Sequence, residues 1–221
     1  PFNGARDIKN KCFRPVSQAF FEDPLRALRV ARFKAQFPEF FLHESMEQAL
    51  FKISASNELL NLSSERVWGE VVKGLEHDFH QFLQIIRNYN LHEPWFNKLS
   101  EIPDINSDIA EIKWCEVSQA NEFKFAMCLD IPKSYSKQLL LWKKFFNYDK
   151  SGDVIYKIKF FEDFSKNNLP DAIFTLQFFK DINLECIPII KEYANLNFGA
   201  LSSNKKQDIK SIKEQELKKI I

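Results

Sequence analysis

Asp23, Arg26 and Arg29 follow one another at intervals of three residues, so on a helix they occupy neighbouring positions on one side. A carboxylate only accepts hydrogen bonds and a guanidinium only donates them, so Asp23 beside Arg26 presents an acceptor next to a donor. Cytosine and adenine offer the complement, an amino donor beside a ring-nitrogen acceptor, whereas guanine and uracil offer the reverse order. A rigid pair would therefore accept C and A, because unsatisfied buried groups cost about 1–3 kcal/mol each. Arg29, one turn further on, could hold a phosphate.

The same residues also have an ordinary structural interpretation. Asp23 is a good helix cap and Pro24 suits the first helical position, so a helix is predicted to begin here. Arg26 would then pair with Asp23 on a solvated face, where such pairs contribute only a few tenths of a kcal/mol. The opposite side of this helix is predicted to be apolar, with Arg32 near its edge. The apolar side is formed by Leu25, Leu28, Ala31 and Ala35. The residues alone leave both interpretations open.

Composition narrows the class of protein. With 221 residues the chain can form one or two domains, and its five glycines argue against a glycine-rich phosphate loop or a turn-rich β fold, so an all-α fold is expected. The net charge of +1 gives no global basic field. No apolar run approaches the roughly 18 residues that span a bilayer, and no signal-peptide pattern is present, so a soluble, cytoplasmic protein is expected. The cysteines lack any paired short spacing, which favours reduced and mostly buried thiols: Cys12, Cys115, Cys128 and Cys186.

Helical periodicity continues along most of the chain. Residues 1–21 are predicted to be irregular, and Ser63 is predicted to cap a helix in which Arg66 and Glu70 form a surface pair. Residues 102–108 are polar and interrupted by proline, which suggests a boundary between residues 1–100 and 101–221. The lysine-rich end is predicted to be a solvated terminal helix or, alternatively, an RNA-binding arm. The other helices are predicted over residues 43–57, 78–89, 118–129, 134–146, 154–165, 171–181 and 186–195.

Residues 17–33 read Ser-x-Ala-Phe-x-Glu-Asp-Pro-Leu-Arg-x-Leu-Arg-x-Ala-Arg-Phe. This segment resembles the nucleotide-selecting motif of bacterial-type class II tRNA nucleotidyltransferases, which are the CCA-adding enzymes, and of the related bacterial poly(A) polymerases. Residues 1–8 together with Arg14 resemble the link between the catalytic head and the neck of that family. Residues 64–70 resemble its later neck motif. Together the three segments cover roughly the first 75 residues in the family's order.

The resemblance implies an all-α array of neck, body and tail, with residues 1–100 selecting CTP or ATP and residues 101–221 binding tRNA. Asp23 and Arg26 would pair with the base edge of the nucleotide, and Arg29 and Arg32 would also contact it. Glu65 and Arg66 of the later neck motif would support the neck without contacting the substrate. Four lysines are candidate contacts to tRNA phosphates or, alternatively, ordinary solvated side chains: Lys143, Lys144, Lys205 and Lys206.

The chain also departs from the family. It contains no counterpart of the catalytic head and its Mg²⁺-binding carboxylates, so we expect a piece of a longer enzyme with no catalytic residue of its own. Pro15 stands at the position after the arginine where members of the family often have a histidine. Residues 125–133 resemble the His-Asp segment of family members that carry a phosphohydrolase domain, but Leu129 replaces the histidine that would bind the metal. The other candidate ligands, His77, Asp78 and His80, are expected to be solvated. No metal is therefore expected in this chain. The alternatives are a poly(A) polymerase fragment and a non-catalytic helical RNA-binding protein.

Overall fold

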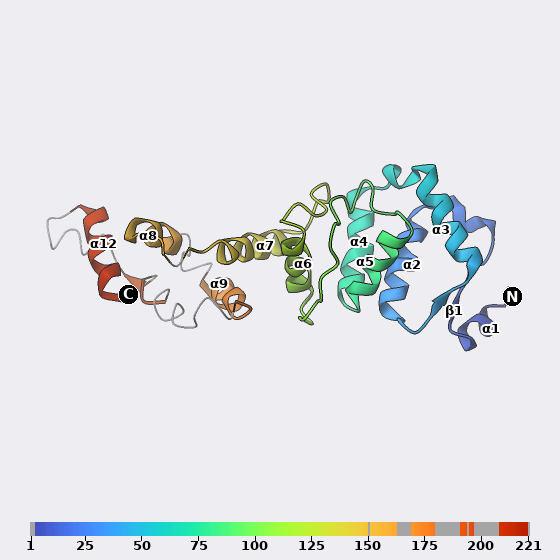
Figure 1. Cartoon of the computed structure of the whole chain (residues 1–221), viewed down its shortest axis with the longest axis horizontal. Coiled ribbons are helices and arrows are strands. Elements are labelled where there is room, and N and C mark those ends of the chain that lie inside the picture. Colours follow the sequence, from blue (N-terminus) through green and yellow to red (C-terminus); the bar gives the residue numbers. More distant parts are fainter. Residues whose placement is uncertain are drawn as a thin grey trace. The chain divides into compact units, whose positions relative to one another are not determined.

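The computed structural model describes residues 3–149, 151–162, 169–179, 191–193, 195–196 and 208–220, and most of these are helical (Figure 1). The only sheet in these ranges has two short strands. The predicted all-α class is therefore confirmed. The chain divides into two units, Pro1–Leu139 and Leu140–Ile221.

Helix α2 (Leu25–Gln36) begins at the residues that the sequence indicates. The Oδ1 atom of Asp23 accepts a hydrogen bond from the backbone N–H of Leu25 at 3.1 Å, and Pro24 has the helical φ of −62°. Asp23 thus satisfies a donor that the helix itself leaves free. The apolar face of α2 is buried, with Ala27, Leu28 and Ala31 fully inaccessible.

Two further helices pack against α2 in the first unit (Figure 1). Helix α4 (Ser64–Leu75) is capped by Ser63 Oγ, which accepts from Arg66 N at 3.4 Å, and helix α5 (Phe79–Asn88) is capped by Asp78. Both predicted starts are confirmed. The core between these helices is wholly apolar at its centre, with Leu28, Val67, Val71, Phe82 and Leu83 buried.

The segment before α2 is more ordered than the sequence indicates. Within the predicted irregular stretch lie helix α1 (Gly4–Lys9), strand β1 (Cys12–Phe13) and the 3-10 helix η1 (Gln18–Glu22). Strand β1 pairs in parallel with β2 (Phe41–Leu42), which follows α2. The ring of Phe13 lies 5.0 Å from that of Phe40, so aromatic packing holds the pairing that local periodicity does not reveal.

The chain then forms helix α3 (Glu44–Ser56), as predicted, followed by the 3-10 helix η2 (Glu58–Asn61). After α5, residues 101–107 are irregular, in agreement with the sequence. The predicted helix over residues 118–129 is wrong, because helix α6 (Ala110–Ala120) ends there and Glu122 and Phe123 adopt positive φ. Buried Asn121 instead fixes this turn, donating to Val117 O and accepting from Glu101 N at 2.9 Å each.

Helix α6 explains why the first unit extends past residue 100, where the sequence suggests a boundary. Its Trp114 packs edge-on against Trp68 of α4 at 5.2 Å between ring centroids, and Trp68 also contacts the ring of Tyr135 at 4.8 Å. These large apolar contacts join residues 110–135 to the core of the first 100 residues. The structure therefore places the division at Leu139.

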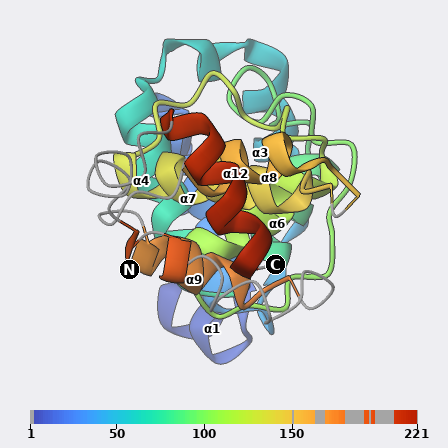
Figure 2. The ribbon, with the colours of Figure 1, turned by 90° about the vertical axis from the view of Figure 1, so that its left-hand side faces the viewer.

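The second unit is built on aromatic contacts between its helices. Helix α7 (Lys133–Phe146) crosses the division, as the predicted helix over residues 134–146 does, and α8 (Val154–Glu162), α9 (Leu169–Leu176) and α12 (Ile209–Ile220) follow. Trp142 lies 4.7 Å from Phe179 and Phe145 lies 5.9 Å from Phe160. Helices α8 and α12 lie against each other (Figure 2). The predicted start of a helix at residue 186 falls outside the described residues, as do Lys205, Lys206 and Cys186.

Candidate functional site

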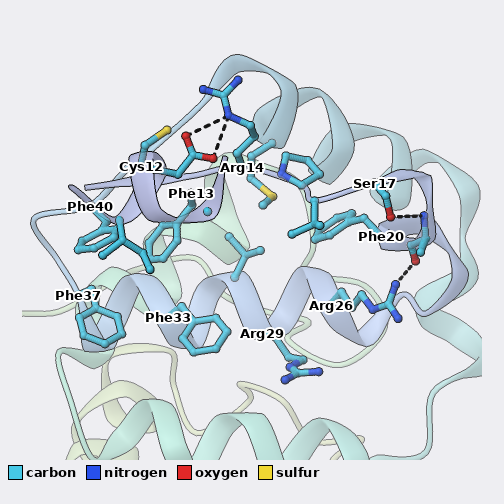
Figure 3. Close-up of a pocket in the computed structure, with 18 residues that line it drawn as sticks. Cys12, Phe13, Arg14, Ser17, Phe20, Arg26, Arg29, Phe33, Phe37 and Phe40 are labelled. Carbon is cyan, nitrogen blue, oxygen red and sulfur yellow. Dashed lines mark hydrogen bonds and ion pairs between the residues drawn. The ribbon is translucent and has the colours of Figure 1, made fainter. Parts of the chain in front are cut away.

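A pocket of about 800 Å³ lies between α2 and the segment formed by α1, β1 and η1 (Figure 3). Phe13, Phe33, Phe37 and Phe40 gather at one end of it, and Ser17, Phe20 and Arg26 lie at the other. The lining is mostly apolar, and it includes Arg26 and Arg29 from successive turns of α2. The pocket therefore combines aromatic surface with positive charge.

Arg26 is held by the backbone of the preceding turn. Its Nη1 atom donates to the carbonyl oxygen of Ala19 in η1. That turn is itself capped by Ser17, whose Oγ accepts from the backbone N–H of Ala19 at 3.3 Å (Figure 3). A guanidinium has five N–H donors, so Arg26 keeps four of them for other partners.

Asp23 is held separately, by the neck motif on α4. Its Oδ2 accepts from Arg66 Nη2 at 2.8 Å, while Oδ1 serves as the helix cap. The two side chains of this ion pair are 29% and 49% exposed, respectively, so the carboxylate remains accessible. The expected Asp23–Arg26 ion pair is absent among the described residues. The two groups are thus fixed by different neighbours, and not by each other.

Arg32 lies away from the pocket and binds a different helix. Its Nε donates to Glu70 Oε2 at 2.7 Å, with the side chains 15% and 9% exposed. Lys73 also approaches Glu70, at 3.8 Å. The predicted Arg66–Glu70 pair is therefore wrong, because Arg32 and Lys73 bind Glu70 and Arg66 binds Asp23.

The remaining predicted site residues occupy exposed positions. Arg29 lines the pocket, is exposed, and has no hydrogen bond or ion pair within the portion of the chain that the structure describes. Glu65 is exposed in the first turn of α4. At the rim of the pocket, Arg14 Nε binds Asp7 Oδ2 at 3.2 Å, and Pro15 lines the wall nearby.

The residues weighed as metal ligands have structural roles. Asp78 caps α5, and the ring of His80 lies 3.3 Å from the carbonyl oxygen of Pro103. His77 lies in the connection before α5, where its carbonyl accepts from Lys113 at 2.6 Å, and Leu129 is buried. Across the described ranges, no group of three or more His, Cys, Asp or Glu side chains could hold a metal ion.

The thiols show no reactive environment in the described residues. Cys12 and Cys115 are buried, whereas Cys128 is exposed, and all three are free. Burial raises the pKa of the Cys115 thiol, and it also raises the pKa of Cys128. Raised pKa values keep these groups as neutral thiols, which are poor nucleophiles. None of the helices described is long and apolar enough to cross a membrane.

Sequence reasoning missed the groups that hold Asp23 and Arg26 in place. The Asp23–Arg66 contact joins residues 43 positions apart, which no local periodicity signals. Ser17 and Ala19 do carry a signal, since a serine two residues before a free N–H is typical of a capped turn. This local signal does not indicate that the Ala19 carbonyl contacts Arg26, because that contact depends on the path of the turn.

Comparisons with known proteins show that the chain is similar to proteins named multifunctional CCA protein or CCA-adding enzyme. It is 42% identical over 102 residues to the multifunctional CCA protein of Pseudoalteromonas atlantica, which covers 45% of this chain and 25% of that protein. It is 47% identical over 91 residues to the multifunctional CCA protein of Vibrio cholerae, covering 40% of this chain and 23% of that protein. The multifunctional CCA protein of Hahella chejuensis is 31% identical over 175 residues, or 71% of this chain and 41% of that protein.

The fold is also similar to that of a solved structure. A solved structure described as tRNA-processing enzyme complex 3 aligns with a TM-score of 0.54 at 19% identity, over 100% of this chain and 69% of that one. No family model matches the chain. The chain spans between 23% and 41% of the length of the three curated relatives above. It belongs to the family of bacterial CCA-adding enzymes, as the motif around Asp23 and Arg26 indicates.

Proposed function

We propose that this chain is the helical, nucleotide-selecting and tRNA-binding part of a cytoplasmic tRNA nucleotidyltransferase that adds C and A to the 3′ end of tRNA. One observation carries the proposal: an acceptor, Asp23, and a donor, Arg26, stand on adjacent turns and are each fixed by a different neighbour. Because neither neutralises the other, both remain able to bind a ligand. A preorganised pair loses little conformational freedom when it binds.

Nucleotide selection would depend on the hydrogen-bonding positions of Asp23 and Arg26 that are not already occupied by protein groups. The carboxylate of Asp23 offers about four lone-pair sites, of which Leu25 N–H and Arg66 each take one. We propose that a remaining site accepts the amino N–H of C or A, while a free N–H of Arg26 donates to the adjacent ring nitrogen. A base with the reverse order would place donor against donor and acceptor against acceptor. The cost of about 1–3 kcal/mol for each unsatisfied group corresponds to roughly 5- to 150-fold discrimination.

We assign the other two arginines different roles. Arg29 is exposed on the pocket and has no protein partner among the residues described, so we propose that it binds the phosphates of the nucleotide. Arg32 is engaged by Glu70 outside the pocket, so we propose that it ties α2 to α4 without touching the nucleotide. Glu65 and Arg66 support the site from α4, with Arg66 in direct contact with Asp23.

The chemical step itself requires groups that the described residues do not provide. Phosphoryl transfer of this kind uses Mg²⁺ held by carboxylates, and the described part of the chain has no suitable cluster. We propose that the catalytic head domain of the same protein supplies that site. The residues of this chain choose and orient the nucleotide.

The helices after residue 100 would bind tRNA. Double-helical RNA is recognised mainly by its shape and its phosphates, which suits helices that bear lysines. Lys143 and Lys144 lie in the last turn of α7, where we propose that they contact the tRNA backbone.

Nucleotide choice by the full-length protein tests the proposal. Arg26→Ala should reduce incorporation of CTP and ATP and relax discrimination against GTP and UTP. Arg87→Ala is the matched control, because Arg87 is exposed in the last turn of α5 and does not line the pocket. Unchanged nucleotide choice in Arg26→Ala would refute the selecting role. Incorporation of ATP alone by the wild type would indicate a poly(A) polymerase, and RNA binding without any incorporation would indicate a non-catalytic protein.

A further inference from the structure

The turn that precedes α2 contacts Arg26 through a chain of two hydrogen bonds. Ser17 Oγ accepts from Ala19 N–H at 3.3 Å, and the carbonyl oxygen of Ala19 accepts from Arg26 Nη1 (Figure 3). Ser17 and Ala19 both line the pocket that Arg26 enters. The hydroxyl of Ser17 thereby holds the N–H of the residue whose carbonyl orients the guanidinium. The backbone carbonyl of Ser17 also accepts from the N–H of Phe20, in the next peptide, at 3.1 Å.

This arrangement is significant because arginine is a long and flexible side chain. Arg26 is only partly buried, and its contact with Ala19 is the one hydrogen bond that its side chain makes to the described residues. The 3-10 turn of residues 18–22 is short, and none of its residues is fully buried, so its cap contributes much of its order. Loss of the cap would let the Ala19 carbonyl move, and Arg26 would lose its fixed direction.

We propose that Ser17 is a positioning residue for nucleotide choice, acting on Arg26 through the Ala19 carbonyl. The proposal rests on the selecting role proposed above for Arg26. Ser17 does not need to touch the nucleotide. Its effect is on how well Arg26 is aligned, and a misplacement of about 1 Å at such a site can cost on the order of 100-fold in rate.

A second serine hydroxyl in the same unit accepts from a backbone N–H two residues on and supplies a matched control. Ser56 Oγ accepts from Glu58 N–H at 3.3 Å at the start of η2, with the same spacing and the same length as the Ser17 cap. Ser56 does not line the pocket. Ser56→Ala therefore removes a hydrogen bond of the same kind without disturbing Arg26, together with the one that Ser56 Oγ donates to Ile53 O at 2.8 Å.

The experiment uses the full-length protein, with incorporation of CTP, ATP and GTP measured separately as kcat and KM. Ser17→Ala should raise KM for CTP and ATP and lower discrimination against GTP by roughly 10-fold. Ser17→Thr, which keeps the hydroxyl, should behave as the wild type, and Ser17→Val, which has the same shape without it, should behave as Ser17→Ala. Ser56→Ala should leave nucleotide choice unchanged.

The outcomes separate this inference from the proposed function. If Arg26→Ala relaxes nucleotide choice and Ser17→Ala does not, Ser17 has no positioning role while the function stands. If Ser17→Thr and Ser17→Val are equally altered, the hydroxyl is not the cause and the inference is overturned. If Arg26→Ala leaves choice unchanged, the proposed function fails and the inference fails with it. If Ser17→Ala proves too unstable to assay, the threonine and valine variants decide, because they differ only in the hydroxyl.

Discussion

The carboxylate of Asp23 receives a hydrogen bond from Arg66 at 2.8 Å, although the two residues lie 43 positions apart in the chain. Arg26, three positions after Asp23, binds the Ala19 carbonyl instead. The contact with Arg66 gives the second neck motif a direct part in holding the acceptor of the proposed base-reading pair. Arg26 and Asp23 therefore form no ion pair with each other among the described residues.

Replacement of Arg66 should alter nucleotide selection more than stability. The Asp23–Arg66 pair is partly exposed, so its loss should cost the folded protein less than about 1 kcal/mol. In the full-length protein, Arg66→Ala should nevertheless lower kcat/KM for ATP by roughly 5-fold or more, because the Asp23 carboxylate can then rotate away. Steady-state kinetics and thermal unfolding of the same variant measure the two effects. An equal and large loss of stability would contradict a positioning role.

Replacement of Arg32 should have the opposite profile. The Arg32–Glu70 pair is mostly buried, so Arg32→Met leaves a buried carboxylate with only Lys73 nearby. Removing one partner of such a pair typically costs about 3–5 kcal/mol, and the lower end is expected here because Lys73 remains. Urea unfolding measures this loss. If the folded fraction of the full-length variant shows relaxed nucleotide choice as well, Arg32 contacts the nucleotide after all.

Two glycines of α4 offer a test of the packing. A Cβ atom at Gly74 would lie 2.8 Å from Cδ2 of Phe82, whereas a Cβ atom at Gly69 would meet no atom within 4 Å. Gly74→Ala should destabilise the protein by about 1–3 kcal/mol, because Phe82 is fully buried and has little room to move. Gly69→Ala should stabilise it by about 0.5–1 kcal/mol, because alanine favours a helix interior. Equal effects in urea unfolding would show that α4 and α5 do not pack as described.

Tyr89 should make stability depend on alkaline pH. Its hydroxyl donates to Glu47 Oε1 at 2.8 Å, and burial, with the hydrogen bond to Glu47 and its charge, raises the pKa of Tyr89 to about 12. An unfolded tyrosine has a pKa of about 10, so the stability that this shift contributes is complete below about pH 10 and is lost as pH rises towards about 12. Chemical denaturation between pH 9 and 12 should show a smaller loss for Tyr89→Phe than for the wild type. Parallel losses would exclude this contribution.

The sequence predicted the helices best where a capping residue and an apolar stripe agree. Asp23 and Ser63 cap their helices as predicted, because a capped turn is a local feature of a few residues. The helix over residues 118–129 was wrong because Glu122 and Phe123 take positive φ, a conformation rare for such side chains. Tertiary contacts of the turn, including those of Asn121, determine that backbone, and periodicity does not record them.

The sequence points to residues of the candidate site, but it does not indicate which neighbouring groups contact them. The motif by which the sequence resembles the CCA-adding enzymes points to Asp23, Arg26 and Arg29, and Arg26 and Arg29 both line one pocket. In the structure Arg32 lies on another face of α2, where it binds Glu70. Residues spaced three apart drift around a helix of 3.6 residues per turn, so the third arginine no longer faces the same way as the first. The contacts with Ala19 and Arg66 depend on how η1 and α4 pack around α2, which no spacing along the chain specifies.

The most direct test of base-edge recognition compares ATP with inosine triphosphate as substrates of the full-length protein. Inosine differs from adenosine only in that a carbonyl replaces the amino group and the ring nitrogen carries a proton, which reverses the donor and acceptor. The wild type should prefer ATP by at least roughly 10-fold, since two groups are left unsatisfied with inosine. Arg26→Ala should reduce this preference to a few-fold. Equal use of both nucleotides by the wild type, or an unchanged preference in Arg26→Ala, would contradict the account.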